Sequence, residues 1–325
     1  MTEYNEHEVW GLTEQGCTQK TTKSLIDSGF TTYLSIAVTP SKEIETLTGL
    51  SLNLSEKVTG LSIRHISKFR TAHEYNEERK KIVRRLTTGS RLFDEILRGG
   101  FETKAITELS GQFASGKSQL CYTSSILVQL PEEEGGLNGG AVVIDTEGTF
   151  LPERLEEIAK TRGYNIPEVM NKIYISRAYN TRQLTELVRA LPEIVERTGA
   201  RLIIVDSMAS HFRSEYIGRE MLAPRQQTLG GILGNLLRVA ESFNAVVLVT
   251  NQMQGNPSGY GGEKMALGNV MAHACTHRIK LRKGRSGIRI AKTVDSPNLP
   301  VQEAPFKVTE KGVVDVEEID EEGDE

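Results

Sequence analysis

The stretch from Gly111 to Ser118 constrains this chain more than any other part of its sequence. It reads Gly-Gln-Phe-Ala-Ser-Gly-Lys-Ser and fits the pattern G-x-x-x-x-G-K-[ST] of a phosphate-binding loop. Such a loop requires a strand before it and a helix after it. The sequence offers a strand-like run at 105–109 and a helix-like run at 119–130. We therefore expect an α/β domain built around a strand–loop–helix unit that binds a nucleotide.

The chemistry of this loop gives its residues separate roles. Its glycines let backbone N–H groups converge on the phosphates, and the following helix adds the positive end of its dipole. We expect Lys117 to reach the β- and γ-phosphates and the Ser118 hydroxyl to ligate Mg²⁺, which makes ATP and Mg²⁺ the expected cofactors. The residues expected to contact the nucleotide are Gly111, Gln112, Phe113, Ala114, Ser115, Gly116, Lys117, Ser118 and Gln119.

From residue 106 onward, short β-branched runs alternate with longer amphipathic segments. Strand–helix alternation at this spacing predicts a mostly parallel sheet with helices on both faces. The expected strands are 141–144, 173–175, 202–205 and 245–249, and the expected helices are 152–162, 182–198 and 224–243.

Polar side chains follow three of these strands directly. Ligands bind outside the carboxyl ends of parallel strands, so Lys117, Glu147, Asp206 and Gln252 are expected at one rim. There Asp206 would hold Mg²⁺, Glu147 would orient or deprotonate the attacking water, and Gln252 would hydrogen-bond the γ-phosphate and report its loss. Each residue alone could be an ordinary polar side chain that forms its hydrogen bonds within the protein at a strand end. Their convergence at one rim favours the functional interpretation.

Two further segments are too polar to be core. Residues 211–225 carry Arg213, Arg219 and Arg225 at intervals of six, and residues 253–269 are rich in glycine with a single aromatic, Tyr260. Loops of this length are often functional, and spaced arginines suit a track for DNA phosphates. An ordinary solvated loop fits the composition equally well.

A third basic segment, 277–292, reads as a hairpin with its turn at 283–287. Arg278, Lys280 and Arg282 alternate with Ile279 and Leu281, which predicts one buried face and one solvated, charged face.

The charge of the chain is unevenly distributed. The net charge is −4, of which residues 315–325 contribute −8, so the remainder carries +4. A mildly basic body is compatible with DNA binding, and the acidic end is expected to be a disordered tail. Residues 1–66 read as a helical N-terminal domain, 67–85 as a charged linker and 86–314 as the α/β core. In the linker, Phe69 either packs on its own domain or anchors another subunit.

Other features point to the cytoplasm. Three widely spaced cysteines suggest neither a zinc site nor a disulfide framework, and the N-terminus lacks the pattern of a secretion signal. The longest apolar runs are far too short to span a bilayer, so no membrane partner is expected.

Several segments together resemble the RecA-type strand-exchange recombinases, specifically their archaeal RadA branch. The likeness extends in unbroken order from about Gly16 to Val314. It is carried by residues 111–119, 145–150, 152–154, 204–207, 212–219, 250–252, 281–285 and 295–297. The resemblance implies a RecA-like ATPase core preceded by a small helix-hairpin-helix domain whose hairpin is 48–51.

The resemblance also implies roles that composition and spacing do not assign. Segments 211–225 and 253–269 correspond to the DNA-binding loops L1 and L2. Phe69 and Ala72 match the F-x-x-A polymerisation motif, which docks into a neighbouring subunit. The remaining implied roles are adenine stacking for Arg154, a cap over the ATP of the next subunit for Asp295 and Pro297, and coupling of that interface to L2 for His273.

The implied function is DNA-dependent ATP hydrolysis coupled to strand exchange between single-stranded and double-stranded DNA. The chain would form helical filaments, with rings as a further possibility, and its mediator partners are not identified by the sequence. An accessory paralogue that binds ATP and DNA without exchanging strands is the alternative. A ring helicase is a weaker one, because the N-terminal module and the F-x-x-A linker count against it.

Some positions depart from the pattern of these recombinases. Gln112 stands where Glu is usual, Ala114 where Gly, Arg or Ser is usual, and Leu151 where Arg is usual. At the end of L2, Leu267-Gly268 replaces a paired glycine. Loss of a glycine restricts the positive-φ conformations through which a loop changes state, and this bears on the efficiency of strand exchange.

Overall fold

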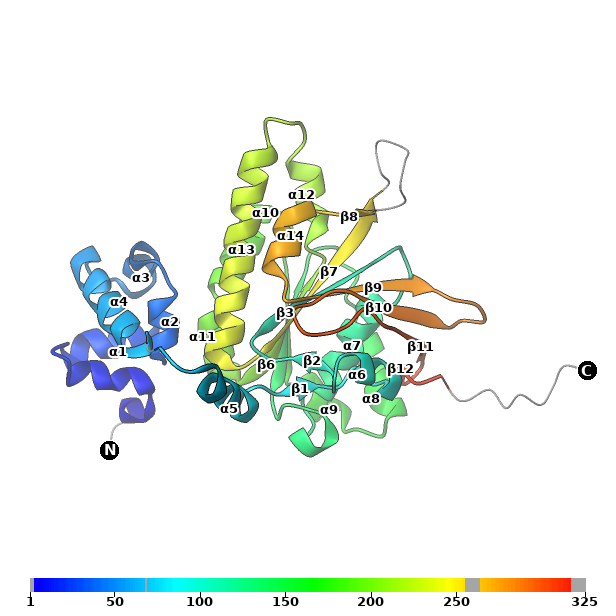
Figure 1. The fold of residues 1–325 in the computed structure, drawn as a ribbon, viewed down its shortest axis with the longest axis horizontal. Helices are drawn as coiled ribbons and strands as arrows, with labels where there is room; N and C mark the ends of the chain where they lie inside the picture. The colour runs from blue at the N-terminus through cyan, green and yellow to red at the C-terminus, as the bar shows by residue number, and fades with distance from the viewer. Residues whose placement is uncertain (1–2, 68, 255–263, 317–325) are drawn as a thin grey trace, which may run out of the picture.

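A ten-stranded sheet forms the centre of the molecule (Figure 1). The computed structural model describes residues 3–67, 69–254 and 264–316. The strand order is β12-β11-β10-β9-β3-β7-β6-β4-β5, with β8 paired to β7. The strands of the parallel part are β3 (Ala105–Gly111), β4 (Gly140–Asp145), β5 (Ile173–Arg177), β6 (Ala200–Asp206), β7 (Val246–Gln254) and β9 (His277–Lys283). The antiparallel strands are β8 (Lys264–Met265), β10 (Arg289–Asp295), β11 (Glu303–Thr309) and β12 (Gly312–Val314).

Helices cover both faces of this sheet, as the alternation of runs predicts. Successive strand residues point to opposite faces, so Val143 and Ile204 enter one hydrophobic core while Val142 and Ile203 enter the other. The first core is covered by α6 (Arg91–Ile96), α7 (Lys117–Leu127), α8 (Pro152–Thr161) and α9 (Ile166–Met170). The second is covered by α10 (Thr181–Arg189), α11 (Leu191–Thr198), α12 (Ala209–Glu215), α13 (Leu222–Phe243) and α14 (Gly268–Ala274). The predicted fold class is therefore confirmed.

The helix expected at 182–198 is two helices. Helix α10 ends at Arg189, and α11 begins at Leu191 with Pro192 in its first turn. Proline has no N–H to donate and its ring clashes with the preceding turn, so one continuous helix cannot pass through this position.

The N-terminal region is helical and has its own small core, which includes Leu25, Ile36 and Val58. Its elements are η1 (Glu3–Glu6), η2 (Glu8–Thr13), α1 (Gln19–Asp27), α2 (Tyr33–Ala37), α3 (Ser41–Thr48) and α4 (Leu52–Ile66). Gly49 ends α3 with a left-handed φ of 69°, and the Ser51 side chain caps α4 by accepting from the Leu54 N–H. Helices α3 and α4 therefore form a helix–hairpin–helix.

This region packs against α11 and α13 of the core. The Thr31 hydroxyl donates to Glu196 over 3.3 Å, and Arg238 lies 3.6 Å from Glu43. Figure 1 shows the helical region on the α11–α13 side of the sheet. No helix in the described ranges is both long and apolar enough to cross a membrane.

The ends of the predicted linker and tail differ from expectation. Most of the linker is a helix, α5 (Ala72–Ile82), because Thr71 and Glu74 form a capping box at its start. After it, β1 (Arg85–Leu86) pairs with β2 (Phe101–Glu102).

Asp315 was assigned to the disordered tail, but its carboxylate accepts from Ser90 Oγ at 2.7 Å and from the Leu92 N–H at 3.0 Å. A carboxylate is favourable at the start of a helix, here α6, so the core includes Asp315. Residues 317–325 lie outside the described part.

Arg278 is not part of a solvated face, although its alternation with Ile279 predicted one. Its Nε donates to Glu108 Oε2 over 2.5 Å, and the two side chains are 12% and 0% exposed. Asn251 Nδ2 donates to the other carboxylate oxygen over 2.6 Å. Strand pairing places Glu108 of β3 directly beside Arg278 of β9, and so this pair depends on tertiary contacts that periodicity cannot reveal.

Replacing Arg278 with Met is expected to lower the free energy of unfolding by about 3–5 kcal/mol, because it leaves the Glu108 carboxylate buried without its cation. Denaturant unfolding measures this change. The matched control is Arg282→Met on the same strand, since Arg282 is half-exposed and pairs with Glu303 at the surface. That control should cost less than about 1 kcal/mol. Similar small losses for both variants would show that the buried pair is not a structural anchor.

Candidate nucleotide-binding site

The phosphate-binding loop joins β3 to α7 in the arrangement that its sequence predicts. Strand β3 ends at Gly111 and α7 begins at Lys117. A side-chain carbon at position 111 would lie 2.5 Å from both the Leu281 carbonyl oxygen and Ser115 Oγ, so only glycine fits. Gly116 has a φ of 107°, which L-amino acids with side chains rarely adopt. The two glycines of the motif are therefore required by local geometry.

The loop fits a polyphosphate. No described side chain caps the start of α7, so its first N–H groups remain available for an anion. Ser115 Oγ is buried and has no hydrogen-bond partner among the described residues. Lys117 Nζ donates to the carbonyl oxygens of Gly111 at 2.9 Å and Gln112 at 3.0 Å. Burial lowers the pKa of Lys117, an effect that Asp206 and Glu147 oppose.

Ser118 and Asp206 lie where the motif predicts a Mg²⁺ site. Asp206 ends β6 and is buried, and its carboxylate accepts hydrogen bonds from Thr250 and Ser118. Burial raises the pKa of Asp206, whereas the hydrogen bonds from Thr250 and Ser118 lower it. The described residues contain no cluster of three or more His, Cys, Asp or Glu side chains that could hold a metal alone. One hydroxyl and one carboxylate suit Mg²⁺, which takes its other ligands from water and phosphate oxygens.

Glu147 and Gln252 meet at the same rim. The Ser207 hydroxyl donates to Glu147 Oε1 over 2.7 Å, and Gln252 Nε2 donates to the same oxygen over 2.8 Å. Arg213 Nη1 donates to Gln252 Oε1 over 2.7 Å. An unbroken chain of hydrogen bonds therefore runs from Arg213 through Gln252 to Glu147.

Asp145 stabilises the loop that carries Glu147, a structural role that the sequence-based predictions did not include. Its Oδ1 accepts from the N–H groups of Glu147 at 2.9 Å and Gly148 at 2.7 Å, and its Oδ2 accepts from Phe150 N–H at 3.3 Å. Arg177 lies 3.4 Å from Oδ2. An Asp followed closely by Gly is a known signature of such a turn, so the order Asp-Thr-Glu-Gly contained the signal.

The three predicted DNA-binding arginines do not lie on one loop. Arg213 lies in α12, Arg219 in the short connection after it, and Arg225 in the first turns of α13. The buried ring of Phe212 extends α12 into the predicted loop. The three arginines, spaced six residues apart in sequence, therefore lie on two helices and the loop that joins them. Of the second segment, residues 255–263 with Tyr260 lie outside the described part.

The predicted cap starts at the last residue of β10, at a level of the sheet three residues away from the end of β3, where the phosphate loop begins. Strand β10 runs antiparallel to β9, which pairs Asp295 with Arg278, whereas Gly111 pairs with Leu281. Asp295 and Pro297 are both exposed. The strand register therefore does not place Asp295 beside the phosphate loop of the chain that carries it.

Of the other residues with implied roles, Phe69 and His273 are exposed and Arg154 is half-buried. Phe69 is fully exposed at 110% and precedes α5, which begins at Ala72. Arg154 in α8 donates from Nε to Gln119 Oε1 over 2.9 Å, beside the phosphate loop. His273 lies in α14, directly after the L2 segment.

Comparison with known proteins decides the family. Residues 78–316 match the Rad51 family model. The chain belongs to the Rad51 family. It is also similar to the DNA repair and recombination protein RadA of Aeropyrum pernix, with 42% identity over 317 residues that cover 96% of this chain and 99% of that protein. The resemblance to RecA-type recombinases of the RadA branch is thereby confirmed.

Two of the residues that differ from the usual sequence pattern of these recombinases share a backbone conformation. Ala114 has a φ of 59° and Leu267 a φ of 63°. Both positions therefore retain the left-handed conformation that glycine adopts freely, at a cost of about 1–2 kcal/mol for a residue with a side chain. The side chains differ in their surroundings, since Ala114 is exposed and Leu267 is buried in the second core beside Met271.

These surroundings predict opposite effects of glycine. Ala114→Gly is expected to raise the free energy of unfolding by about 0.5–1 kcal/mol, because it removes strain and loses no packing. Leu267→Gly is expected to lower it, because loss of a buried leucine side chain costs about 2–5 kcal/mol and outweighs the relief. Thermal and denaturant unfolding of both variants test this. A destabilised Ala114→Gly variant would show that relief of backbone strain does not dominate at that position. A stabilised Leu267→Gly variant would show that the lost packing does not outweigh the relief of strain.

Proposed function

We propose that this protein is an ATP-dependent DNA strand-exchange recombinase. It forms helical filaments on single-stranded DNA and pairs that strand with homologous double-stranded DNA in recombination and repair. The observation that carries the proposal is the hydrogen-bond chain Arg213–Gln252–Glu147, which joins a basic edge to the carboxylate beside the phosphate loop. The similarity to RadA of Aeropyrum pernix supports recombination and repair as the biological setting.

Hydrolysis of ATP depends on Glu147. When bound, Mg²⁺ would neutralise the charge that develops on the phosphate oxygens. Lys117 would bind the β- and γ-phosphates, and Ser118 and Asp206 would hold the metal. The Glu147 carboxylate orients the attacking water and accepts its proton. One oxygen of that carboxylate is occupied by Gln252 and Ser207.

Gln252 connects nucleotide state to DNA. Its amide donates to Glu147, so a γ-phosphate oxygen that accepts from the same amide releases the carboxylate for catalysis. Its carbonyl oxygen accepts from Arg213, and a DNA phosphate competes with it for that guanidinium. Arg219 and Arg225 extend the same track along the backbone without reading sequence. DNA thereby stimulates hydrolysis through the two hydrogen bonds of Gln252, one from Arg213 and one to Glu147.

Assembly completes the nucleotide site. The separation of Asp295 and Pro297 from the phosphate loop of the same chain supports their role as a cap over the ATP of the next subunit. Arg154 stacks on the adenine, and His273 couples this interface to L2. Phe69 and Ala72 dock into a neighbour, for which the full exposure of the Phe69 ring is the supporting observation. Filaments are the active assembly.

Strand exchange with different nucleotides tests this function. Exchange between single-stranded DNA and a homologous duplex is expected with ATP and with a non-hydrolysable analogue, but not with ADP, because the γ-phosphate stabilises the active filament. Lys117→Ala should reduce both exchange and DNA-stimulated hydrolysis to background, whereas the exposed Lys160→Ala in α8 should leave both within about twofold of the parent.

Two outcomes would overturn the proposal. Exchange with ADP would remove the role of the γ-phosphate as a switch. DNA-stimulated hydrolysis without any exchange would identify the accessory paralogue instead, and directional unwinding would identify a helicase.

A further inference from the structure

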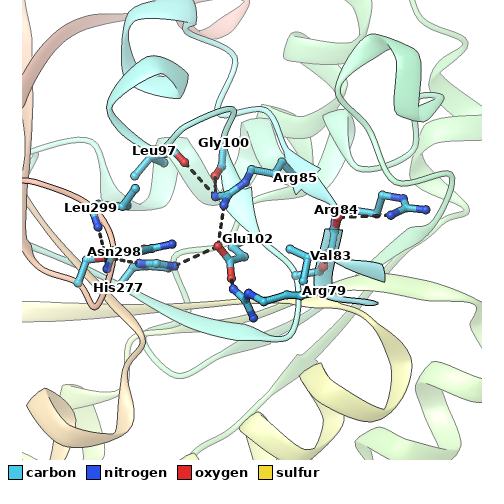
Figure 2. A network of polar contacts seen from close by, with 12 residues as sticks. Arg79, Val83, Arg84, Arg85, Leu97, Gly100, Glu102, His277, Asn298 and Leu299 are labelled. Atoms are coloured by element: carbon cyan, nitrogen blue, oxygen red, sulfur yellow. Dashed lines mark hydrogen bonds and ion pairs between the residues drawn. The ribbon is translucent and has the colours of Figure 1, made fainter. Parts of the chain in front are cut away.

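A buried carboxylate lies between the linker helix and the predicted ATP cap. Glu102 of β2 is 2% exposed, and Arg85 Nη2 donates to its Oε2 over 2.7 Å. Arg79 of α5 forms an ion pair with its Oε1. Figure 2 shows Arg85 and Arg79 approaching Glu102 from opposite sides, with His277 on a third. Glu102 is thus a junction of three cationic or polar groups from separate elements.

His277 connects this junction to the cap segment. Its Nε2 is 3.7 Å from Glu102 Oε2, which is too long for a direct hydrogen bond but favourable electrostatically. Its Nδ1 is 3.0 Å from Ser296 Oγ. The imidazole is 5% exposed, so water does not screen either interaction. An Nε2–H directed at the carboxylate leaves Nδ1 as an acceptor for the Ser296 hydroxyl, with Asn298 Oδ1 at 3.1 Å as the competing acceptor of the same hydrogen.

Ser296 in turn orders the segment that follows Asp295. Its Oγ accepts from the N–H groups of Leu299 at 3.0 Å and Asn298 at 3.3 Å. Leu299 is buried, and this fixes the far end of the turn. Pro297 lies inside this turn. The position of the cap therefore depends on where the Ser296 hydroxyl is held.

Glu102 is charged at neutral pH despite its burial. Burial alone would raise its pKa, but the His277 imidazole and the charges of Arg85 and Arg79 hold the pKa at about 2. A permanent negative charge at the junction favours the His277 tautomer that directs N–H toward it.

We propose that His277 is a positioning residue that fixes the cap segment 295–298 relative to helix α5, through Glu102 on one side and Ser296 on the other. This inference rests on the proposed function, in which α5 follows the polymerisation motif and the cap covers ATP in a neighbouring subunit. The two segments through which one subunit contacts another are thereby held in one geometry. Docking of Phe69 and closure of the cap are then coupled within a single chain.

The test separates ATP binding at an assembled site from ATP binding by an isolated subunit. His277→Ala is expected to raise the apparent KM for ATP in DNA-dependent hydrolysis by about tenfold, with kcat within about twofold, because the cap contributes binding while the catalytic rim is untouched. His277→Asn should recover part of the loss, since its amide takes the place of Nδ1 beside Ser296. Arg91→Ala is the matched control, because Arg91 is exposed and pairs with Glu95 on α6, outside this junction.

Two further measurements guard against a folding defect. Arg79→Ala changes a side chain that is 41% exposed and should raise the KM in the same direction by a smaller factor, about threefold. In a Phe69→Ala background, at concentrations where sedimentation shows isolated subunits, calorimetry should give the same ATP affinity with and without His277→Ala.

The outcomes distinguish this inference from the proposed function. If the parent chain neither assembles nor hydrolyses ATP with DNA, the proposed function fails. If the parent does both but His277→Ala has an unchanged KM, only the positioning role of His277 fails. The same KM for the Ala and Asn variants, or a weakened ATP affinity in isolated subunits, would also contradict it.

Discussion

The register of four parallel strands is the constraint on which the rest of this structure depends. Strand pairing places Asp145 beside Asp206 and Gly111 beside Gln252, so the carboxyl ends of β3, β4, β6 and β7 finish at one level. Side chains alternate along a strand, and a shift of one residue would turn these groups to the opposite faces of the sheet. The continuous apolar runs that fill both cores fix the register. The phosphate loop, the proposed metal site and the proposed catalytic carboxylate are thus positioned by packing in the two hydrophobic cores.

The same rim explains how nucleotide and DNA are coupled in the proposed mechanism. The Gln252 amide donates to Glu147, and the proposed mechanism has a γ-phosphate draw that amide away. In that mechanism a γ-phosphate competes with Glu147 for the Gln252 amide, and a DNA phosphate competes with the Gln252 carbonyl oxygen for Arg213, so the carboxylate responds to both. Along the strands, three residues separate this rim from the level of the cap, because Gly111 pairs with Leu281 and Asp295 with Arg278. In the proposed assembly one chain carries two half-sites, and a head-to-tail interface between copies joins them into a filament.

Much of this arrangement follows from sequence alone. The strand–loop–helix context of Gly111–Ser118, the four strand ends and the two-sided sheet are local or periodic signals, and the structure agrees with them. The break before Pro192 follows from local chemistry that the periodicity concealed. Arg278 and Asp315 were misjudged because their partners, Glu108 and Ser90, are distant in the chain. The spacing of Arg213, Arg219 and Arg225 suggested one loop because Phe212, the residue that extends the helix, is recognisable as buried only in three dimensions.

The central claim is that ATP is bound between subunits, and the dependence of ATPase activity on protein concentration tests it most directly. With DNA and ATP saturating, activity per subunit is predicted to rise with concentration as half-sites meet, and then to level off. Phe69→Ala should stay at the low value over the same range, whereas Tyr75→Ala, an exposed aromatic change on α5, should follow the parent. A constant activity per subunit for the parent chain at all concentrations would show that each subunit holds a complete site and would contradict the account.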